Sequence, residues 1–185
     1  MAEWMVDNLE ITGLCLRLRL VVPEDARFIH ALRTDPAYNS HLSPVTGTVT
    51  DQRRWIENYK IREAAGAEFY YVIERLDGTP CGVVRLYDIA GDSFTWGSWI
   101  LDHNKPPKAA LESAVLSFGI GFEGLGLHRA LIDVRKDNTH ATAFYRRFGM
   151  TETGADTENL YFMLSRDDFR RNRDSFMNIL QEQPT

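Results

Sequence analysis

Asn138 and Tyr145 are the two side chains whose types and spacing point most directly to chemistry. Ala141, Phe144, Tyr145 and Phe148 repeat at helical spacing, so the residues after Asn138 are predicted to form one amphipathic helix. An amide at the start of that helix can bind a polar ligand. A phenol two turns later can donate a proton, because tyrosine keeps its proton up to a pH of about 10. The structural alternative is a helix N-cap and a core tyrosine with a satisfied hydroxyl.

The elements around this helix are also predicted from their residues. An apolar run at residues 130–134 precedes it and indicates a buried strand, and Gly149 follows it where a left-handed residue commonly ends a helix. This succession resembles the last motif of the Gcn5-related N-acetyltransferases. In that family the asparagine bonds the pantetheine or phosphate portion of acetyl-CoA, and the tyrosine protonates the departing thiolate. The resemblance implies these roles for Asn138 and Tyr145.

The order of elements along the chain supports the same family. We expect a strand at 16–20, helices from about Pro23 and Thr50, strands at 69–75, 81–89 and 94–101, a helix at 107–124, the strand and helix above, a strand near 161–164 and a last helix. The resemblance covers residues 16–164, and residues 97–101 and 122–129 resemble the ribosomal-protein and polyamine acetyltransferase branch. It implies a mixed α/β (α+β) fold with a mostly antiparallel twisted sheet, splayed between its fourth and fifth strands and flanked by helices. One domain is expected over residues 1–185, with a core at about 14–165 and a C-terminal helix at about 167–181.

Composition narrows the partners. The formal charge of −5 argues against nucleic acid, and no apolar run reaches the roughly 18 residues of a membrane span. Residues 1–7 lack a basic region followed by an apolar one, so a cytoplasmic location is expected. Cys15 and Cys81 fall in predicted strands and are interpreted as core residues. The histidines have no metal-ligand spacing with one another or with cysteine, so we expect no metal.

The donor site is expected in two places. In the family a glycine-rich loop binds the CoA pyrophosphate through backbone N–H groups, and here residues 105–110 occupy that loop with the sequence Lys-Pro-Pro-Lys-Ala-Ala. Two prolines remove two donors, while the lysines offer positive charge; a solvated loop that opens a helix is the alternative. The resemblance also implies that the fourth strand pairs with pantetheine. The expected cofactor-binding residues are Trp99, Ile100, Leu101, Lys105, Lys108, Ala109, Ala110, Asn138 and Tyr145.

The general base is less evident. Many relatives carry a glutamate two residues before the glycine that is Gly97 here, and this chain has Thr95 instead. Nearby acids, Asp88, Asp92 and Asp102, lie at predicted strand ends, with solvated turn residues as their structural alternative. His41, in a loop between two helices, is the other candidate, with an exposed loop histidine as its structural alternative. Without a fixed base, an amine of low pKa is favoured, which points to an amino sugar. Candidate substrate contacts are His41, Arg53, Arg54, Arg85 and Thr95.

Three functions follow as hypotheses. The first is an acetyl-CoA-dependent N-acetyltransferase for a primary amine of a small molecule, with an amino sugar, nucleotide-linked in the leading version, as acceptor. The second is a protein N-terminal or polyamine acetyltransferase. The third is a catalytically silent acyl-CoA-binding protein of this fold. Apolar residues on the last helix, Phe169, Phe176 and Leu180, also suggest packing on a second copy as a homodimer.

Overall fold

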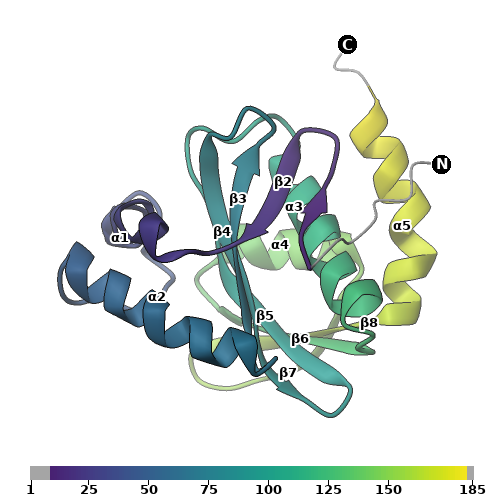
Figure 1. Cartoon of the computed structure of the whole chain (residues 1–185). Helices are drawn as coiled ribbons and strands as arrows, with labels where there is room; N and C mark the ends of the chain where they lie inside the picture. The colour runs from purple at the N-terminus through teal and green to yellow at the C-terminus, as the bar shows by residue number, and fades with distance from the viewer. Residues whose placement is uncertain (1–8, 183–185) are drawn as a thin grey trace.

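A computed structural model describes residues 9–182 (Figure 1). Residues 1–8, which carry the expectation about export, and residues 183–185 lie outside the described part. Eight strands form one sheet in the order β1-β2-β3-β4-β5-β6-β8-β7. Their bounds are β1 Ile11–Thr12, β2 Leu16–Leu20, β3 Phe69–Arg75, β4 Pro80–Ala90, β5 Ser93–Leu101, β6 Arg129–Arg135, β7 Thr151–Ala155 and β8 Asn159–Ser165. The helical segments are the short η1 Pro23–Asp25, α1 Ala26–Thr34, α2 Val49–Ala64, α3 Ala109–Gly119, the π-helical η2 Ile120–Gly124, α4 Thr139–Phe148 and α5 Arg166–Gln181.

The sheet opens between β5 and β6. These two strands run parallel and pair only through Ser93–Arg129, Phe94–Ala130 and Thr95–Leu131, whereas the other neighbouring strands are antiparallel. Beyond Thr95 the two strands diverge, and the expected splay between the fourth and fifth predicted strands lies here. A splayed sheet leaves backbone groups on the inner edges of both strands without sheet partners.

Two hydrophobic cores cover the faces of the sheet. The larger one packs α3, α4 and α5 on one face and includes Trp96, Phe118 and Phe162; the smaller one packs α1 and α2 on the other and includes Ile29, Ile56 and Tyr59. Figure 1 shows α1 and α2 to the left of the strands and α3 and α5 to the right. The alternating leucines of β2 follow the predicted pattern, since Leu16 and Leu18 are fully buried.

Gly121 explains why α3 passes into a π-helical turn tightly packed on the sheet. A Cβ atom at Gly121 would lie 2.3 Å from Cζ of Phe94, so only glycine lets the helix approach β5 this closely. Close packing at this end of the helix therefore depends on Gly121 and not on Gly119. A Cβ at Gly119 would meet nothing within 4 Å.

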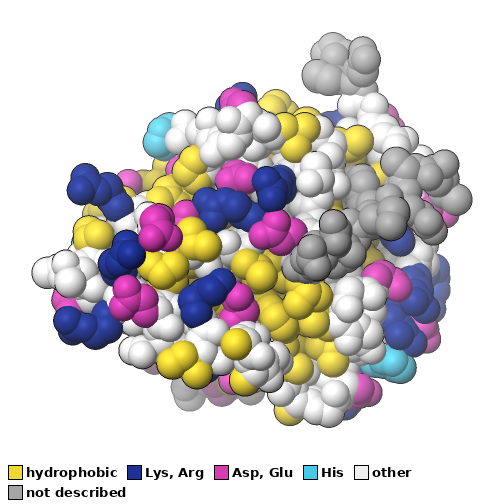
Figure 2. All heavy atoms as spheres, in the orientation of Figure 1, with side chains coloured by type: hydrophobic (Ala, Val, Ile, Leu, Met, Phe, Trp, Pro, Cys, Tyr) yellow, Lys and Arg dark blue, Asp and Glu magenta, His cyan; other side chains and the backbone are white. Residues whose placement is uncertain are grey.

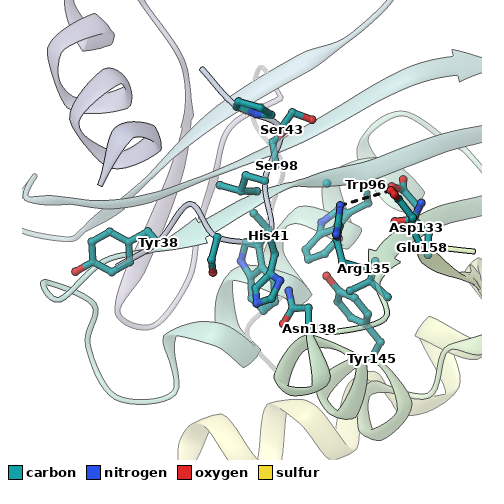
Figure 3. A pocket seen from close by; sticks show the side chains of 17 residues that line it. Tyr38, His41, Ser43, Trp96, Ser98, Asp133, Arg135, Asn138, Tyr145 and Glu158 are labelled. Carbon is teal, nitrogen blue, oxygen red and sulfur yellow. Dashed lines mark ion pairs between the residues drawn. The ribbon is translucent and has the colours of Figure 1, made fainter. Parts of the chain in front are cut away.

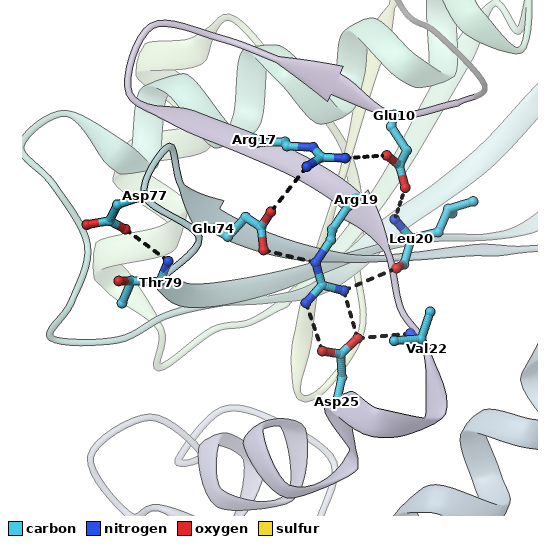
Figure 4. A network of polar contacts seen from close by, with 9 residues as sticks. All are labelled: Glu10, Arg17, Arg19, Leu20, Val22, Asp25, Glu74, Asp77 and Thr79. Atoms are coloured by element: carbon cyan, nitrogen blue, oxygen red, sulfur yellow. Dashed lines mark hydrogen bonds and ion pairs between the residues drawn. The ribbon is translucent and has the colours of Figure 1, made fainter.

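A network of charged groups holds the start of α1 against the sheet (Figure 4). Arg19 on β2 forms two hydrogen bonds with Asp25, of 2.8 and 2.9 Å, and a third of 2.9 Å with Glu74 on β3. Bidentate pairing of this kind fixes orientation as well as distance. Across the face in Figure 2, Lys and Arg side chains lie beside Asp and Glu over α1 and α2, so the charge there is mixed rather than of one sign.

One expectation, the placement of Cys15, needs correction. Cys15 is not in a strand; it lies exposed in the turn between β1 and β2, where its N–H donates to Oε1 of Glu112 at 2.8 Å. Cys81, in contrast, is buried in β4 as predicted, and burial raises the pKa of its thiol to about 12. The apolar residues of α5 pack inside the chain, with the Phe176 ring 4.4 Å from that of Phe148. They therefore give no support to a dimer interface.

Candidate active site

A cavity of about 460 Å³ lies where β5 and β6 diverge (Figure 3). We call it the central cavity. Five segments line it: the loop after α1, the middle of β5, the end of β6, the start and middle of α4, and the turn before β8. The lining residues lie at positions 38, 40–44, 96–99, 133–135, 138, 145 and 158–159. The splay of the sheet thus creates a site to which separate parts of the chain contribute.

Tyr145 lies at the inner wall of the central cavity. Its side chain is only 6% exposed, with its ring packed edge-on against Trp96 and Phe162 at 6.0 and 5.8 Å. Figure 3 shows its hydroxyl pointing into the cavity. Burial, aided by the negative charge of Asp133, raises the pKa of Tyr145 well above its ordinary value. The hydroxyl is therefore a stable hydrogen-bond donor at neutral pH.

Asn138 combines the two readings that the sequence left open. Its side-chain oxygen accepts a hydrogen bond from the Ala141 N–H at 3.2 Å, so it is the N-cap of α4. It also lines the central cavity beside Tyr145. Because the oxygen is engaged with the helix, the amide NH₂ group is the part of Asn138 that remains for a ligand.

The middle of β5 carries a β-bulge. Arg85 pairs with Gly97 and Val83 with Ile100, so two residues of β5, Ser98 and Trp99, lie opposite one residue of β4. Ser98 has a φ of 51°, in the left-handed region. The bulge interrupts the pairing with β4 at Ser98 and Trp99, both of which line the cavity.

Two tryptophans of β5 are anchored on α3. The Trp96 Nε1–H donates to Oγ of Ser117 at 2.9 Å, and the Trp99 Nε1–H donates to Oγ of Ser113 at 3.1 Å. The two serines are one helical turn apart and both are fully buried. These hydrogen bonds satisfy the polar ends of both indoles and fix the cavity wall that they form.

His41 reaches the central cavity from the loop after α1. Its Nδ1 lies 3.3 Å from Oδ1 of Asp137, which follows β6 on the opposite side of the splay. The separation is within ion-pair distance, although its geometry does not meet hydrogen-bond criteria. Nδ1 is thus the ring nitrogen beside the carboxylate, and Nε2 is the one left for another partner.

Charged residues of β6 and of the turn before β8 complete the lining. Asp133 and Glu158 contribute carboxylates, and Arg135 lies 3.6 Å from Glu158. Sequence reasoning did not single out Asp133 or Glu158 as site residues. A signal for Asp133 was present, because it is an acidic residue within an otherwise apolar predicted strand.

The lysine loop is placed differently from the cavity. Lys105 is exposed, and neither Lys105 nor Lys108 lines the central cavity. The Lys108 ammonium donates to the backbone oxygens of Ile179 and Glu182 at 2.5 and 2.6 Å, so it caps the end of α5. Ala109 is buried and its N–H donates to Pro106 at 3.3 Å. The charge of Lys105 is therefore more accessible to a phosphate group than that of Lys108.

The other substrate candidates lie outside the central cavity. Arg53 pairs with Glu24 and Glu57 on the exposed side of α2, and Arg54 pairs with Asp51. Arg85 is bound to buried Glu68 and lies over the rings of Trp55 and Tyr87. Thr95 lines a separate shallow cavity on the sheet, together with Asp133. The structure brings only His41, of the five substrate candidates, to the central cavity.

Metal-binding groups and membrane-spanning helices are two further features to consider in the described part of the chain. Among residues 9–182, no group of three or more His, Cys, Asp or Glu side chains is arranged to hold a metal ion. Within the same residues, none of the helices has the length and apolar character needed to cross a bilayer.

Comparison with known proteins identifies the family. A family model described as an acetyltransferase (GNAT) domain matches residues 16–151. Among solved structures, apo FdhC, described as a nucleotide-linked sugar GNAT, is 38% identical with a TM-score of 0.82, and the match covers 88% of this chain and 93% of that one. A search of curated protein sequences gave no significant match.

More distant structures share the fold. A spermidine N-acetyltransferase from Vibrio cholerae, in complex with CoA and spermine, is 21% identical with a TM-score of 0.73, covering 84% of this chain and 98% of that one. A ribosomal-protein-S5-alanine acetyltransferase from Vibrio fischeri is 14% identical with a TM-score of 0.74, covering 86% and 98%. The chain therefore belongs to the GNAT acetyltransferase family and is an N-acyltransferase of the kind that uses acetyl-CoA.

Proposed function

We propose that this protein transfers an acetyl group to the primary amine of a nucleotide-linked amino sugar. The observation that carries the proposal is the grouping of Tyr145, His41 and the open edge of β5 around one cavity. The acceptor class is supported by the 38% identity to a nucleotide-linked sugar GNAT over nearly the whole chain. The relatives that act on polyamines or ribosomal protein are 21% identical or less, so they support the fold alone.

The residues on β5 and α4 fit an acyl-CoA. Beyond Thr95 the edge of β5 that faces β6 has no sheet partner among the described pairings, so its backbone groups can hydrogen-bond the amides of pantetheine. The Asn138 NH₂ group is available at the start of α4 for the same chain or its phosphates. Acetyl-CoA, when bound, supplies the thioester whose acetyl group the amine attacks. Backbone donors at the Ser98 bulge would stabilise negative charge on the acetyl oxygen.

His41 is proposed as the general base. A protonated amine cannot attack a carbonyl carbon, so a group in the cavity must take up one of its protons. Nε2 of His41 is suited to this because Asp137 lies 3.3 Å from the other ring nitrogen, Nδ1, so Nε2 is left for the amine. Thr95, at the position of the glutamate in many relatives, cannot accept a proton in this way, so His41 replaces that function from a different element.

Tyr145 is proposed as the donor to the departing sulfur. A thiolate needs a hydrogen-bond donor as the carbon–sulfur bond breaks, and the Tyr145 hydroxyl keeps its proton because burial raises its pKa. The high pKa also makes complete ionisation of Tyr145 costly near Asp133. The proposed role of Tyr145 is therefore to donate a hydrogen bond from Oη to the sulfur.

Asp133 and Glu158 are proposed to attract the acceptor. An amino sugar approaches with its amine protonated, and carboxylates in a cleft raise the local concentration of cations. Arg135 compensates part of this charge through its contact with Glu158. The combination suits one ammonium group rather than the several of a polyamine.

A direct assay tests the proposal. CoA release is measured with thymidine and uridine diphosphate amino sugars, with spermidine, and with a peptide bearing a free N-terminal amine. We expect the nucleotide-linked sugars to give the highest kcat/KM. Turnover of spermidine or of the peptide alone would reject the acceptor class and leave the acetyltransferase activity in place.

A further inference from the structure

A second cavity lies beside the central one. We call it the side cavity; it has a volume of about 360 Å³ and lies between the end of α1, the start of α2 and the loop that joins them. Both cavities are lined by Pro44, so this loop forms a wall of each. A ligand with two parts joined by a short linker is therefore suited to occupy both cavities at once.

Arg33 marks the junction of the two cavities. It lines the side cavity, and its guanidinium donates a long hydrogen bond of 3.5 Å to the backbone oxygen of Ser43, which lines the central cavity. Its Nε is buried and has no hydrogen-bond partner among residues 9–182. A buried guanidinium donor without a partner is costly, and phosphate oxygens satisfy such a donor with charge-assisted bonds.

Gln52 and Trp55 line the floor of the side cavity on α2. Gln52 is only 6% exposed, and it lines the side cavity. A carboxamide presents one acceptor and two donors, which complement the N–H and carbonyl groups of a uracil or thymine ring. Trp55 also lines the cavity, and its ring is held in place by stacking on Tyr59 at 5.9 Å and by the guanidinium of Arg85 at 5.5 Å.

The far wall of the side cavity is held in a fixed shape. The backbone N–H of Thr48 donates to Oδ2 of Asp51 at 2.8 Å. This hydrogen bond is the largest of several influences that lower the pKa of Asp51. Gly47 has a φ of 107°, and a Cβ there would lie 2.7 Å from Oδ2 of Asp51. The Asp51 carboxylate is thus charged and rigidly placed. A carboxylate of this kind repels phosphate but accepts hydrogen bonds from ribose hydroxyls.

We propose that the side cavity binds the pyrimidine nucleoside diphosphate portion of the acceptor. Arg33 contacts the diphosphate at the junction, Asp51 accepts from the ribose, and Gln52 and Trp55 receive the base. The sugar then extends past Pro44 into the central cavity, where its amine meets His41. This assignment rests on the proposed function, because it supposes a nucleotide-linked acceptor, and it adds the part of the chain that recognises the nucleotide.

Calorimetry with thymidine diphosphate, uridine diphosphate and inorganic pyrophosphate tests the site. Arg33→Ala should weaken binding of both nucleotides by about tenfold or more, and binding of pyrophosphate as well. Gln52→Ala should weaken the nucleotides by about threefold to tenfold and leave pyrophosphate unchanged. Arg53→Ala is the matched control, since Arg53 is on the exposed side of the same helix, and it should change neither.

CoA itself contains an adenosine diphosphate group, so binding at the CoA site must be distinguished from binding at the side cavity. Thymidine diphosphate binding is repeated with saturating CoA, and the affinity should be retained. Loss of binding under CoA, or unchanged binding in Arg33→Ala, would overturn the proposal. Thermal unfolding of each variant, together with Arg33→Lys as a conservative change, separates lost folding from lost recognition.

Kinetics separates this proposal from the proposed function. In Arg33→Ala, the KM for a nucleotide-linked amino sugar should rise about tenfold while kcat and acetyl-CoA affinity change little. If these sugars are turned over with a KM insensitive to Arg33, the side cavity is not the nucleotide site and the function stands. If the nucleotides bind as described but no nucleotide-linked sugar is acetylated, the site stands and the proposed acceptor is wrong.

Discussion

His41 and Asp137 meet across the splay of the sheet, with Nδ1 of one 3.3 Å from Oδ1 of the other. His41 belongs to the loop that separates the two cavities, and Asp137 immediately precedes the N-cap of α4. The contact therefore joins the proposed acceptor side of the cavity to the helix that presents Tyr145. Arg135, at 3.6 Å from Asp137, shares the same carboxylate.

Replacement of His41 with Asn should lower kcat/KM by about a hundredfold or more, the range typical of losing a general base. A histidine accepts a proton only when neutral, so the wild type should lose activity on acidification, and His41→Asn should lose this acid limb. Asp137→Asn should reduce the rate less and should retain the limb. The measurement is kcat/KM against pH.

His128→Asn is the matched control for the His41 variant, because His128 is exposed in the turn before β6 and lines no described cavity. Its profile should match that of the wild type. An unchanged acid limb in His41→Asn would assign the base to another group, and Asp133, a carboxylate that lines the central cavity, would be tested next.

Tyr145→Phe should lower kcat by about a hundredfold and change acetyl-CoA affinity little. The ring that packs on Trp96 and Phe162 is kept, so the fold should be retained. Stopped-flow or steady-state rates and calorimetric binding give the two values. A variant that unfolds earlier but turns over normally would make Tyr145 a core residue only.

The raised pKa of Tyr145 gives a prediction for the alkaline range. Burial favours the neutral phenol in the folded protein, so its stabilising contribution is complete below the ordinary pKa of about 10 and is lost as pH rises through the higher folded value. The wild-type kcat should therefore show no decline from Tyr145 ionisation up to about pH 10. A fall near pH 8 that disappears in Tyr145→Phe would contradict this assignment.

Lys105 and Lys108 should differ when each is replaced by Ala. Loss of exposed Lys105 should raise the acetyl-CoA dissociation constant about fivefold at low salt, corresponding to one contact of about 1 kcal/mol. Loss of Lys108 should lower the melting temperature, because its ammonium caps α5 at Ile179 and Glu182. Binding titrations at two salt concentrations and thermal unfolding distinguish them. If both variants weaken CoA binding equally, Lys108 also contacts the CoA phosphates.

Gly121→Ala and Gly119→Ala form a matched pair on one helix. The first places Cβ 2.3 Å from Phe94 and should destabilise the fold by about 1–3 kcal/mol through overpacking. The second meets open space and should stabilise it by up to about 1 kcal/mol, the difference in helix propensity. Denaturant unfolding measures both. Equal stability changes would mean that the contact with Phe94 does not limit packing.

The sequence predicts the long, periodic elements well and misses those without a pattern. The bounds of β2 and β3 match the predicted strands, and Gly149 ends α4 with a φ of 94°. β1 has two residues, and β7 is exposed at every position, so neither carries an alternating signal. Their formation depends on backbone pairing with β2 and β8, which a single segment does not reveal.

The same distinction, between residues within one periodic element and residues that distant segments bring together, applies to the candidate site. Asn138 and Tyr145 could be found because one helix carries both. Arg53 and Arg54 line neither cavity. The buried positions of α2 begin at Gln52, and the helical period turns the next two side chains outward. The contact of His41 with Asp137, and the placement of Arg33 and Gln52 around one cavity, depend on how distant segments meet, which no local spacing indicates.

Three of the four tryptophans line the two cavities, while Trp4 lies outside the described residues. Trp96 and Trp99 face the central cavity with their indole N–H groups bonded to serines, and Trp55 faces the side cavity. Intrinsic fluorescence therefore reports on both cavities without a label. Quenching by an acyl-CoA should persist in Trp55→Phe, whereas the response to a nucleoside diphosphate should be lost. Comparison of this variant with the wild type can therefore follow donor and acceptor binding separately.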